Sequence, residues 1–150
     1  MRRTLQRFTL LALVGFSLGP AACSNHYVTP VKYPETGASL EGTVTYAGQK
    51  IRVAMIIARA EKGDSAETFM TDDGRYKIEN VPLGEVTIGV NTAAGRGVMI
   101  GRQMAASKVK GGPPLPQVID VPAKYADPRT SGITTTINPG ANTFDIVIPK

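Results

Sequence analysis

The sequence predicts an all-β fold, a seven-stranded antiparallel Greek-key β-sandwich in a single domain. Short runs that alternate apolar and polar residues recur along the chain, and turn-forming residues separate them. The 150 residues include 16 Gly and 11 Pro, a usage typical of a fold with many tight turns. No long helix-forming run interrupts this pattern, and a domain of this length buries a core without disulfides.

The first two predicted strands lie at 40–46 and 51–59. The run LEGTVTY at 40–46 alternates, so its apolar residues share one face. The sequence AGQK then turns the chain. The run IRVAMIIAR at 51–59 is continuously apolar between its arginines, which predicts a central strand buried on both faces.

Two further strands flank the sequence Asp72-Asp73-Gly74, one at 67–71 and one starting at Arg75. An Asp-Gly pair between alternating runs predicts a hairpin, because tight hairpin turns need a positive φ that glycine adopts without strain. Tyr76 and Ile78 are expected to face inward. A calcium loop is the alternative, but it needs several more oxygen ligands and a distal bidentate carboxylate, so a plain turn is favoured.

The remaining strands are predicted at 85–91, 132–137 and 142–148. Between the first two of these lies the long segment 92–131, which has Gly-rich and Pro-rich parts and no clear periodicity. Part of it, 97–104, is a candidate for an additional strand. Loops of this length inside compact domains are usually functional, so 92–131 is the predicted partner surface.

The N-terminal 22 residues have the layout of a secretory signal peptide. Residues 1–7 are basic, residues 8–18 are an uncharged apolar run, and small residues follow. Eleven helical residues rise about 16 Å, too little to cross a hydrocarbon core of about 30 Å. The alternative is a buried core helix, which the basic flank and the break at Gly19-Pro20 disfavour.

Cys23 is the only cysteine, and it follows this segment directly. The sequence Ala21-Ala22-Cys23 resembles the end of the bacterial lipobox, although Pro20 replaces the usual leucine-like residue. We therefore expect diacylglycerol on Cys23. The alternatives are cleavage by an ordinary signal peptidase, an intermolecular disulfide, or a catalytic thiol paired with His26, the only histidine.

These features divide the chain into a signal peptide at 1–22, a linker with a lipidated cysteine at 23–38, and a β-sandwich domain at 39–150. The mature protein is expected to be exported and held on a membrane by its lipid, and to face the periplasm or the cell surface.

Charge excludes a nucleic-acid partner. The net charge is +5, and removal of the three arginines of the signal peptide leaves +2, too little for a basic binding face. One histidine and one cysteine are too few for a zinc site, so no cofactor is expected. One stretch of the sequence contains several cations and no acid. These cations could contact anionic lipid or an acidic partner, or the stretch could be a solvated loop. These candidate contact residues are Arg96, Arg102, Lys108 and Lys110.

The string FMTDDGRYKIENVPLGEVTIGV resembles the carboxypeptidase-regulatory-like domain, a transthyretin-like (prealbumin-like) β-sandwich. The resemblance spans about 40–148 and is specific for the fold rather than for an activity. The residues that carry it are Thr71, Asp72, Gly74, Tyr76, Ile78, Val81, Pro82 and Gly84.

This resemblance implies a non-catalytic module, so the chain is not expected to be an enzyme. The expected function is that of a cell-envelope lipoprotein with a binding or structural domain. Its expected partners are the membrane, through the lipid, and an envelope protein or polysaccharide. The alternatives are a small transthyretin-like hydrolase and a carbohydrate-binding module. Tyr125 is expected to pack against the sheet rather than to bind sugar.

Overall fold

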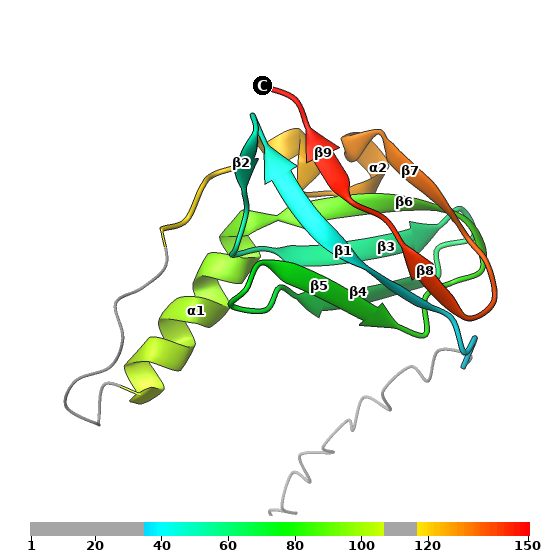
Figure 1. Ribbon diagram of the computed structural model, residues 1–150, viewed down its shortest axis with the longest axis horizontal. Coiled ribbons are helices and arrows are strands. Elements are labelled where there is room, and N and C mark those ends of the chain that lie inside the picture. The colour runs from blue at the N-terminus through cyan, green and yellow to red at the C-terminus, as the bar shows by residue number, and fades with distance from the viewer. Residues whose placement is uncertain (1–34, 107–116) are drawn as a thin grey trace, which may run out of the picture. The chain divides into compact units, whose positions relative to one another are not determined.

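The computed structural model describes residues 35–106 and 117–150, which belong to one compact unit at 32–150 (Figure 1). The signal peptide, Cys23, Lys108 and Lys110 lie outside the described residues. Strands are the main secondary structure of the described chain and form two sheets that pack face to face, so the expectation of a two-sheet β fold is confirmed.

The first sheet is built around β1 (Ser39–Tyr46). Along one edge of β1 run the antiparallel strands β2 (Gln49–Lys50) and β5 (Arg75–Glu79). Along the other edge run β8 (Ala141–Thr143) and β9 (Ile146–Ile148), both parallel to β1. The prediction of an antiparallel sandwich is therefore wrong for this edge, and the first sheet is mixed.

The side chain of Asn142 fixes the turn that brings β8 alongside β1 in a parallel direction. Its side-chain amide donates to the carbonyl oxygens of Asn138 (2.8 Å) and Gly140 (3.0 Å), and its oxygen accepts from the Asn138 amide (2.9 Å). The same amide donates to the carbonyl of Ser39 at 3.2 Å. The turn that leads from the second sheet is thus fixed to the start of β1, and the chain continues alongside β1 in the same direction.

The second sheet has the order β4 (Ser65–Phe69), β3 (Met55–Ala60), β6 (Gly84–Asn91) and β7 (Ile133–Ile137), and every neighbouring pair is antiparallel. Its central pair, β3 and β6, holds Ile56 opposite Val90 and Ala58 opposite Ile88.

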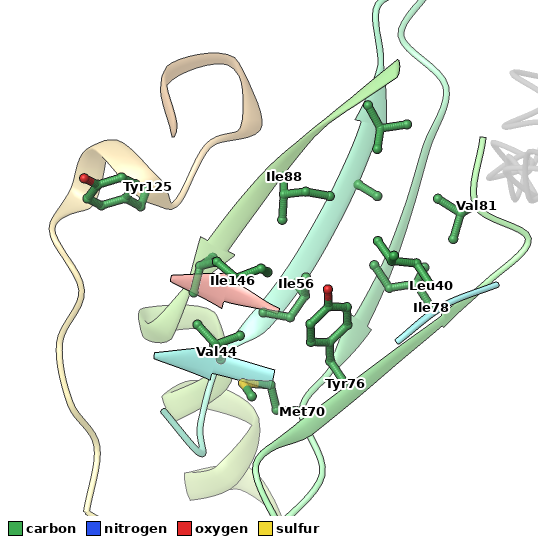
Figure 2. Packing of buried hydrophobic residues seen from close by; sticks show 14 of the residues in the cluster. Leu40, Val44, Ile56, Met70, Tyr76, Ile78, Val81, Ile88, Tyr125 and Ile146 are labelled. Carbon is green, nitrogen blue, oxygen red and sulfur yellow. The ribbon is translucent and has the colours of Figure 1, made fainter. Parts of the chain in front are cut away.

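The core lies between the sheets (Figure 2). Strand β5 buries Tyr76 and Ile78 and exposes the residues between them, as the alternation predicts. Strand β6 likewise buries the three apolar residues of its inner face. Burying one side chain of this size contributes about 1.5–3 kcal/mol. The largest fully buried side chains are those of Tyr76, Leu40, Ile51, Ile56, Ile78, Ile88, Ile146, Ile148, Val44, Val81, Val86 and Val90.

The described residues form nine strands where the sequence predicts seven. The run 51–59 is not one strand, because 51–54 carries the chain from the first sheet to the second and β3 begins only at Met55. Nor is it buried on both faces, since Met55 and Ile57 are only half-buried. The run 142–148 is divided between β8 and β9.

The Asp-Gly turn forms, but the hairpin prediction is wrong because β4 and β5 belong to different sheets. Gly74 has a φ of +76°. The Thr71 amide donates to the Arg75 carbonyl at 2.9 Å, and the Thr71 hydroxyl and the Arg75 amide both donate to the Asp73 carboxylate. The Asp73 oxygen is therefore engaged within the turn, which then directs the chain into the opposite sheet.

Candidate functional site

The segment 92–131 is predicted to be irregular, but its described parts, 92–106 and 117–131, form three helical elements: α1 (Thr92–Ala106), the 3₁₀ turn η1 (Ala123–Tyr125) and α2 (Pro128–Ser131). The candidate strand at 97–104 is therefore wrong. Its residues form the middle of α1, which begins where the Asn91 side chain accepts a hydrogen bond from the Ala94 amide at 2.8 Å.

Helix α1 contacts the sandwich near its start. Gly95 is buried there, and a Cβ on Gly95 would lie only 2.6–2.9 Å from backbone atoms of Ala54. From Ile100 to Ala105 every residue is exposed. Figure 1 shows the helix extending away from both sheets. The first half of α1 is thus docked by close backbone approach, and the second half projects into solvent.

The structure places two of the four candidate contact residues on this helix. Arg96 forms an ion pair with Asp120, and this hydrogen-bonded contact raises the pKa of the guanidinium and lowers the pKa of the Asp120 carboxyl. Arg102 is exposed and forms no ion pair among the described residues. Of the four cations, only these two belong to the described residues, and of the two only Arg96 is ion-paired there.

The end of the segment covers the outer face of the second sheet. A Cβ on Gly89 would lie 2.7 Å from Pro128 Cδ, so α2 packs directly on β6. Tyr125 is buried, as predicted, and the Lys124 ammonium lies 4.6 Å from the centre of its ring. This half of the segment is therefore part of the folded body rather than a free loop.

Asp127 caps α2 and accepts hydrogen bonds from Arg129. The Arg129 amide donates to the carboxylate at 2.9 Å, and the guanidinium donates to both carboxylate oxygens, with the shortest distance 2.6 Å. These bonds lower the pKa of Asp127 to about 2. The carboxylate is thus held in its ionised form by its own helix.

A pocket of about 740 Å³ lies at one end of the second sheet. Its walls come from the β3–β4 loop, from the turn between β5 and β6, and from Thr36 at the start of the described domain. The turn is fixed by the Thr36 hydroxyl, which donates to the Val81 carbonyl at 2.7 Å, and by positive φ values at Asn80 and Gly84. Five ionisable side chains line the pocket: Arg59, Glu61, Lys62, Asp64 and Glu85.

None of these five side chains forms an ion pair within 35–106 and 117–150. Two cations and three carboxylates therefore lie around a cavity whose lining is apolar in its larger part, with their charges available to a ligand. Such a site favours a molecule that carries charges of both signs. The sequence does not predict this pocket, because its walls come from separate segments that only the fold brings together.

Two absences hold for the described part of the chain. It contains no group of three or more His, Cys, Asp or Glu side chains that could hold a metal ion. It also contains no helix that is both long enough and apolar enough to cross a membrane.

Comparison of the chain with protein-family models finds no match, and comparison with curated proteins finds none either. The resemblance to the carboxypeptidase-regulatory-like domain therefore stays a prediction.

Proposed function

We propose that this chain is a non-catalytic binding module of the cell envelope, and that it binds its ligand in the pocket between the β3–β4 loop and the β5–β6 turn. The observation that carries the proposal is the set of five ionisable side chains around a cavity of about 740 Å³, none paired with another described residue. Loops at the end of a rigid sandwich are a common place for binding sites, because the sheets hold them in position.

The proposed fold is a Greek-key sandwich of the carboxypeptidase-regulatory-like type. The support for this fold comes from one short part of the chain, the turn at Gly74 and the strand that follows it. Gly74 takes the positive φ that the motif requires, and Tyr76 and Ile78 pack inward at the motif's apolar positions. Members of that family are usually non-catalytic.

The proposed location is the envelope, with the domain exported and anchored through lipid on Cys23. Its support is the sequence of the signal segment and the position of the single cysteine. The test is the intact mass of the protein purified from membranes, compared with that of a Cys23→Ala variant. A mature chain that begins at Cys23 and carries diacylglycerol is expected. An unlipidated chain cut at another position would exclude the anchor.

The proposed ligand carries both positive and negative charge, as a segment of an envelope protein or an amino-sugar polysaccharide does. Two probes test this class: the tetrapeptide Gly-Asp-Lys-Gly and a disaccharide of glucosamine and a uronic acid. Titration of the protein by NMR is expected to shift amide signals in the β3–β4 loop and the β5–β6 turn, and to leave those of the first sheet unchanged.

Arg59→Gln and Glu85→Gln each remove one charge from the pocket, and each is expected to weaken binding about tenfold. The matched control is Lys77→Gln, which removes an exposed charge from the first sheet. Absence of shifts in the pocket with either probe at millimolar concentration, or equal effects of the pocket and control variants, would overturn the proposed site.

A further inference from the structure

Strand β7 lies at an edge of the second sheet, with β6 as its single neighbour among the described strands (Figure 1). Its sequence is Ile-Thr-Thr-Thr-Ile, so every residue is β-branched, none is charged and none is proline. Its pairing with β6 is continuous and contains no bulge. Proteins usually protect an edge strand from pairing with another chain by charges, proline, bulges or very short strands. Strand β7 has none of these protections and is of ordinary length.

The other sheet edges in the described chain are protected. At the opposite edge of the second sheet, β4 carries Glu67. On the first sheet, β5 carries Arg75, Lys77 and Glu79, and β2 ends in Lys50. Strands β8 and β9 have only three residues each. This contrast indicates that another strand covers the edge of β7 in the assembled protein.

The register of the second sheet determines which backbone groups lie at this edge. The Ala60 amide donates to the Asp64 carbonyl at 2.8 Å, so Ala60 directs its backbone groups towards β4 rather than β6. These directions alternate along an antiparallel strand, so the preceding residue, Arg59, bonds with its partner Thr87 on β6. The neighbour of Thr87, Val86, therefore directs its backbone groups towards β7.

The same alternation applies along β7. Thr135 is the partner of Val86 and forms its backbone hydrogen bonds with β6. Thr134 and Thr136 therefore direct their N–H and C=O groups away from the sheet, and no backbone hydrogen bond from another described segment reaches them. The side chains of both are exposed. The edge thus presents alternating donors and acceptors at the spacing of an extended chain.

We propose that β7 pairs with β7 of a second copy of the chain, in the antiparallel direction and about a two-fold axis. The sequence of β7 reads the same in both directions, so a pairing centred on Thr135 matches every residue. Ile133 then lies opposite Ile137 of the other copy, and Thr134 lies opposite Thr136. Near such an axis a charged residue would face its own equivalent, and the uncharged edge avoids this repulsion, while paired threonines stabilise the sheet.

This pairing joins the four-stranded sheets of the two copies into one continuous sheet. Thr134 and Thr136 of the other copy exchange both backbone hydrogen bonds, and Thr135 meets its equivalent in a pair without such bonds. Helix α2 leaves the edge open, because it packs on β6, where Gly89 meets Pro128. An interface of one short strand is small, so we expect a dissociation constant on the order of 10 µM. The pairing requires neither the lipid anchor nor the pocket.

The first test is a disulfide at the centre of the pairing. In Thr135→Cys the two cysteines face each other across the axis with Cα atoms about 4.5 Å apart, within the range of a disulfide. In the matched control Thr134→Cys the equivalent Cα atoms are about 9 Å apart, beyond that range. Both variants are full chains in a mild detergent and carry Cys23→Ser, so that neither the native thiol nor a lipid on it joins two copies.

After mild oxidation, Thr135→Cys is expected to form a covalent dimer at least tenfold faster than Thr134→Cys. The control is demanding, because Thr134 is exposed whereas Thr135 is half-buried, so random collisions would favour the control. Equal rates, or faster cross-linking of Thr134→Cys, would exclude the proposed pairing.

The second test is sedimentation velocity of the full chain with Cys23→Ser alone, in the same detergent, from about 1 to 300 µM. A reversible equilibrium between monomer and dimer is expected. Thr136→Lys places a cation on the edge and should raise the dissociation constant at least tenfold. Gln49→Lys adds the same charge to the exposed strand β2 and should leave it unchanged.

Circular dichroism of both lysine variants checks that the fold is kept. A chain that stays monomeric over the whole range would contradict the inference, as would equal effects of the two lysines. Oligomers that continue to grow beyond the dimer would also contradict it, because a two-fold pairing closes at two copies.

Discussion

The hydroxyl of Tyr76 on β5 donates a hydrogen bond of 2.6 Å to the carbonyl of Phe144, which lies between β8 and β9 on the far side of β1. Tyr76 stands opposite Gly42 in the register of β1 and β5, so no side chain blocks its path. The next residue, Asp145, accepts from the Thr43 amide (2.8 Å) and hydroxyl (2.7 Å). One buried side chain thus joins the two edges of the first sheet. Figure 2 shows the Tyr76 ring among the buried residues of the core.

Removal of that hydroxyl is expected to destabilise the fold. Tyr76→Phe keeps the ring but leaves the Phe144 carbonyl without this donor, which costs about 1–2 kcal/mol in the free energy of unfolding. The measurement is urea denaturation followed by circular dichroism. Tyr46→Phe is the control, since the Tyr46 hydroxyl donates no hydrogen bond within the described residues, and it should cost less than about 0.5 kcal/mol. Equal losses for both variants would refute the role assigned to Tyr76.

Gly42 is expected to tolerate no side chain. A Cβ at this position would lie 2.1 Å from the Phe144 carbonyl oxygen, so Gly42→Ala must displace the backbone between β8 and β9. We expect a loss of at least about 3 kcal/mol, or no soluble folded protein. Gly101→Ala, where the added carbon meets nothing within 4 Å, is the comparison, measured in the same denaturation series. A Gly42→Ala protein with wild-type stability would show that this close approach does not exist.

Two glycines of α1 are expected to respond in opposite directions. Gly95→Ala pushes the helix off Ala54, so the α1 amides should exchange hydrogen faster and stability should fall. Gly97→Ala adds a methyl group in open space and improves helix propensity by up to about 1 kcal/mol, so exchange should slow. Hydrogen exchange followed by mass spectrometry checks both. The assignment fails if the two variants shift exchange in the same direction.

Asp127 is expected to make the stability depend on pH in the acid range. Its folded pKa of about 2 lies below the ordinary 3.8, mainly because of the hydrogen bonds from the Arg129 side chain. The ionised carboxylate therefore stabilises the fold fully above pH 3.8, and this contribution is lost as the pH falls towards 2. Carboxyl ¹³C titration by NMR should give a midpoint near 2, and the midpoint should rise towards 3.8 in Arg129→Gln.

Arg52→Gln is the control for this titration, because it removes an exposed guanidinium that is not among the causes of the Asp127 shift. It should leave the Asp127 midpoint where it is in the wild type. If the midpoint is the same in Arg129→Gln as in the wild type, the hydrogen bonds from Arg129 do not set it.

Strands whose signal is local were predictable from the sequence. In β5 and β6 every second residue is apolar, and alternation alone decides which side chains enter the core. The turn at Gly74 is also local, because its geometry depends on a few neighbouring residues. The sheet to which each strand belongs is not a local property. The turn that resembles a hairpin therefore joins different sheets, and the parallel pairing of β8 with β1 was missed.

Helix α1 and the pocket were missed for different reasons. Three glycines, at 95, 97 and 101, lower the intrinsic helix propensity of α1 by about 1 kcal/mol each, so its sequence resembles a loop. What holds its first half is the approach of Gly95 to Ala54, a tertiary contact. The pocket combines segments that are far apart in the chain, and no single segment has a binding motif. Deleting all of 92–131 would also remove Val121 and Tyr125 from the core. Tests of the predicted partner surface should therefore change residues of α1 alone.

The parallel pairing of β1 with β8 and β9 has a consequence for the order of events during synthesis. Thr43 and the Asp145 that holds it are 102 residues apart, and β9 ends only at Ile148. Until that strand has left the ribosome, one edge of β1 has no neighbour, and Ile146 and Ile148 are missing from the core. Completion of the first sheet therefore waits for nearly the whole domain. During that interval the N-terminal segment is already accessible, and the nascent domain can still be threaded through a channel as an extended chain.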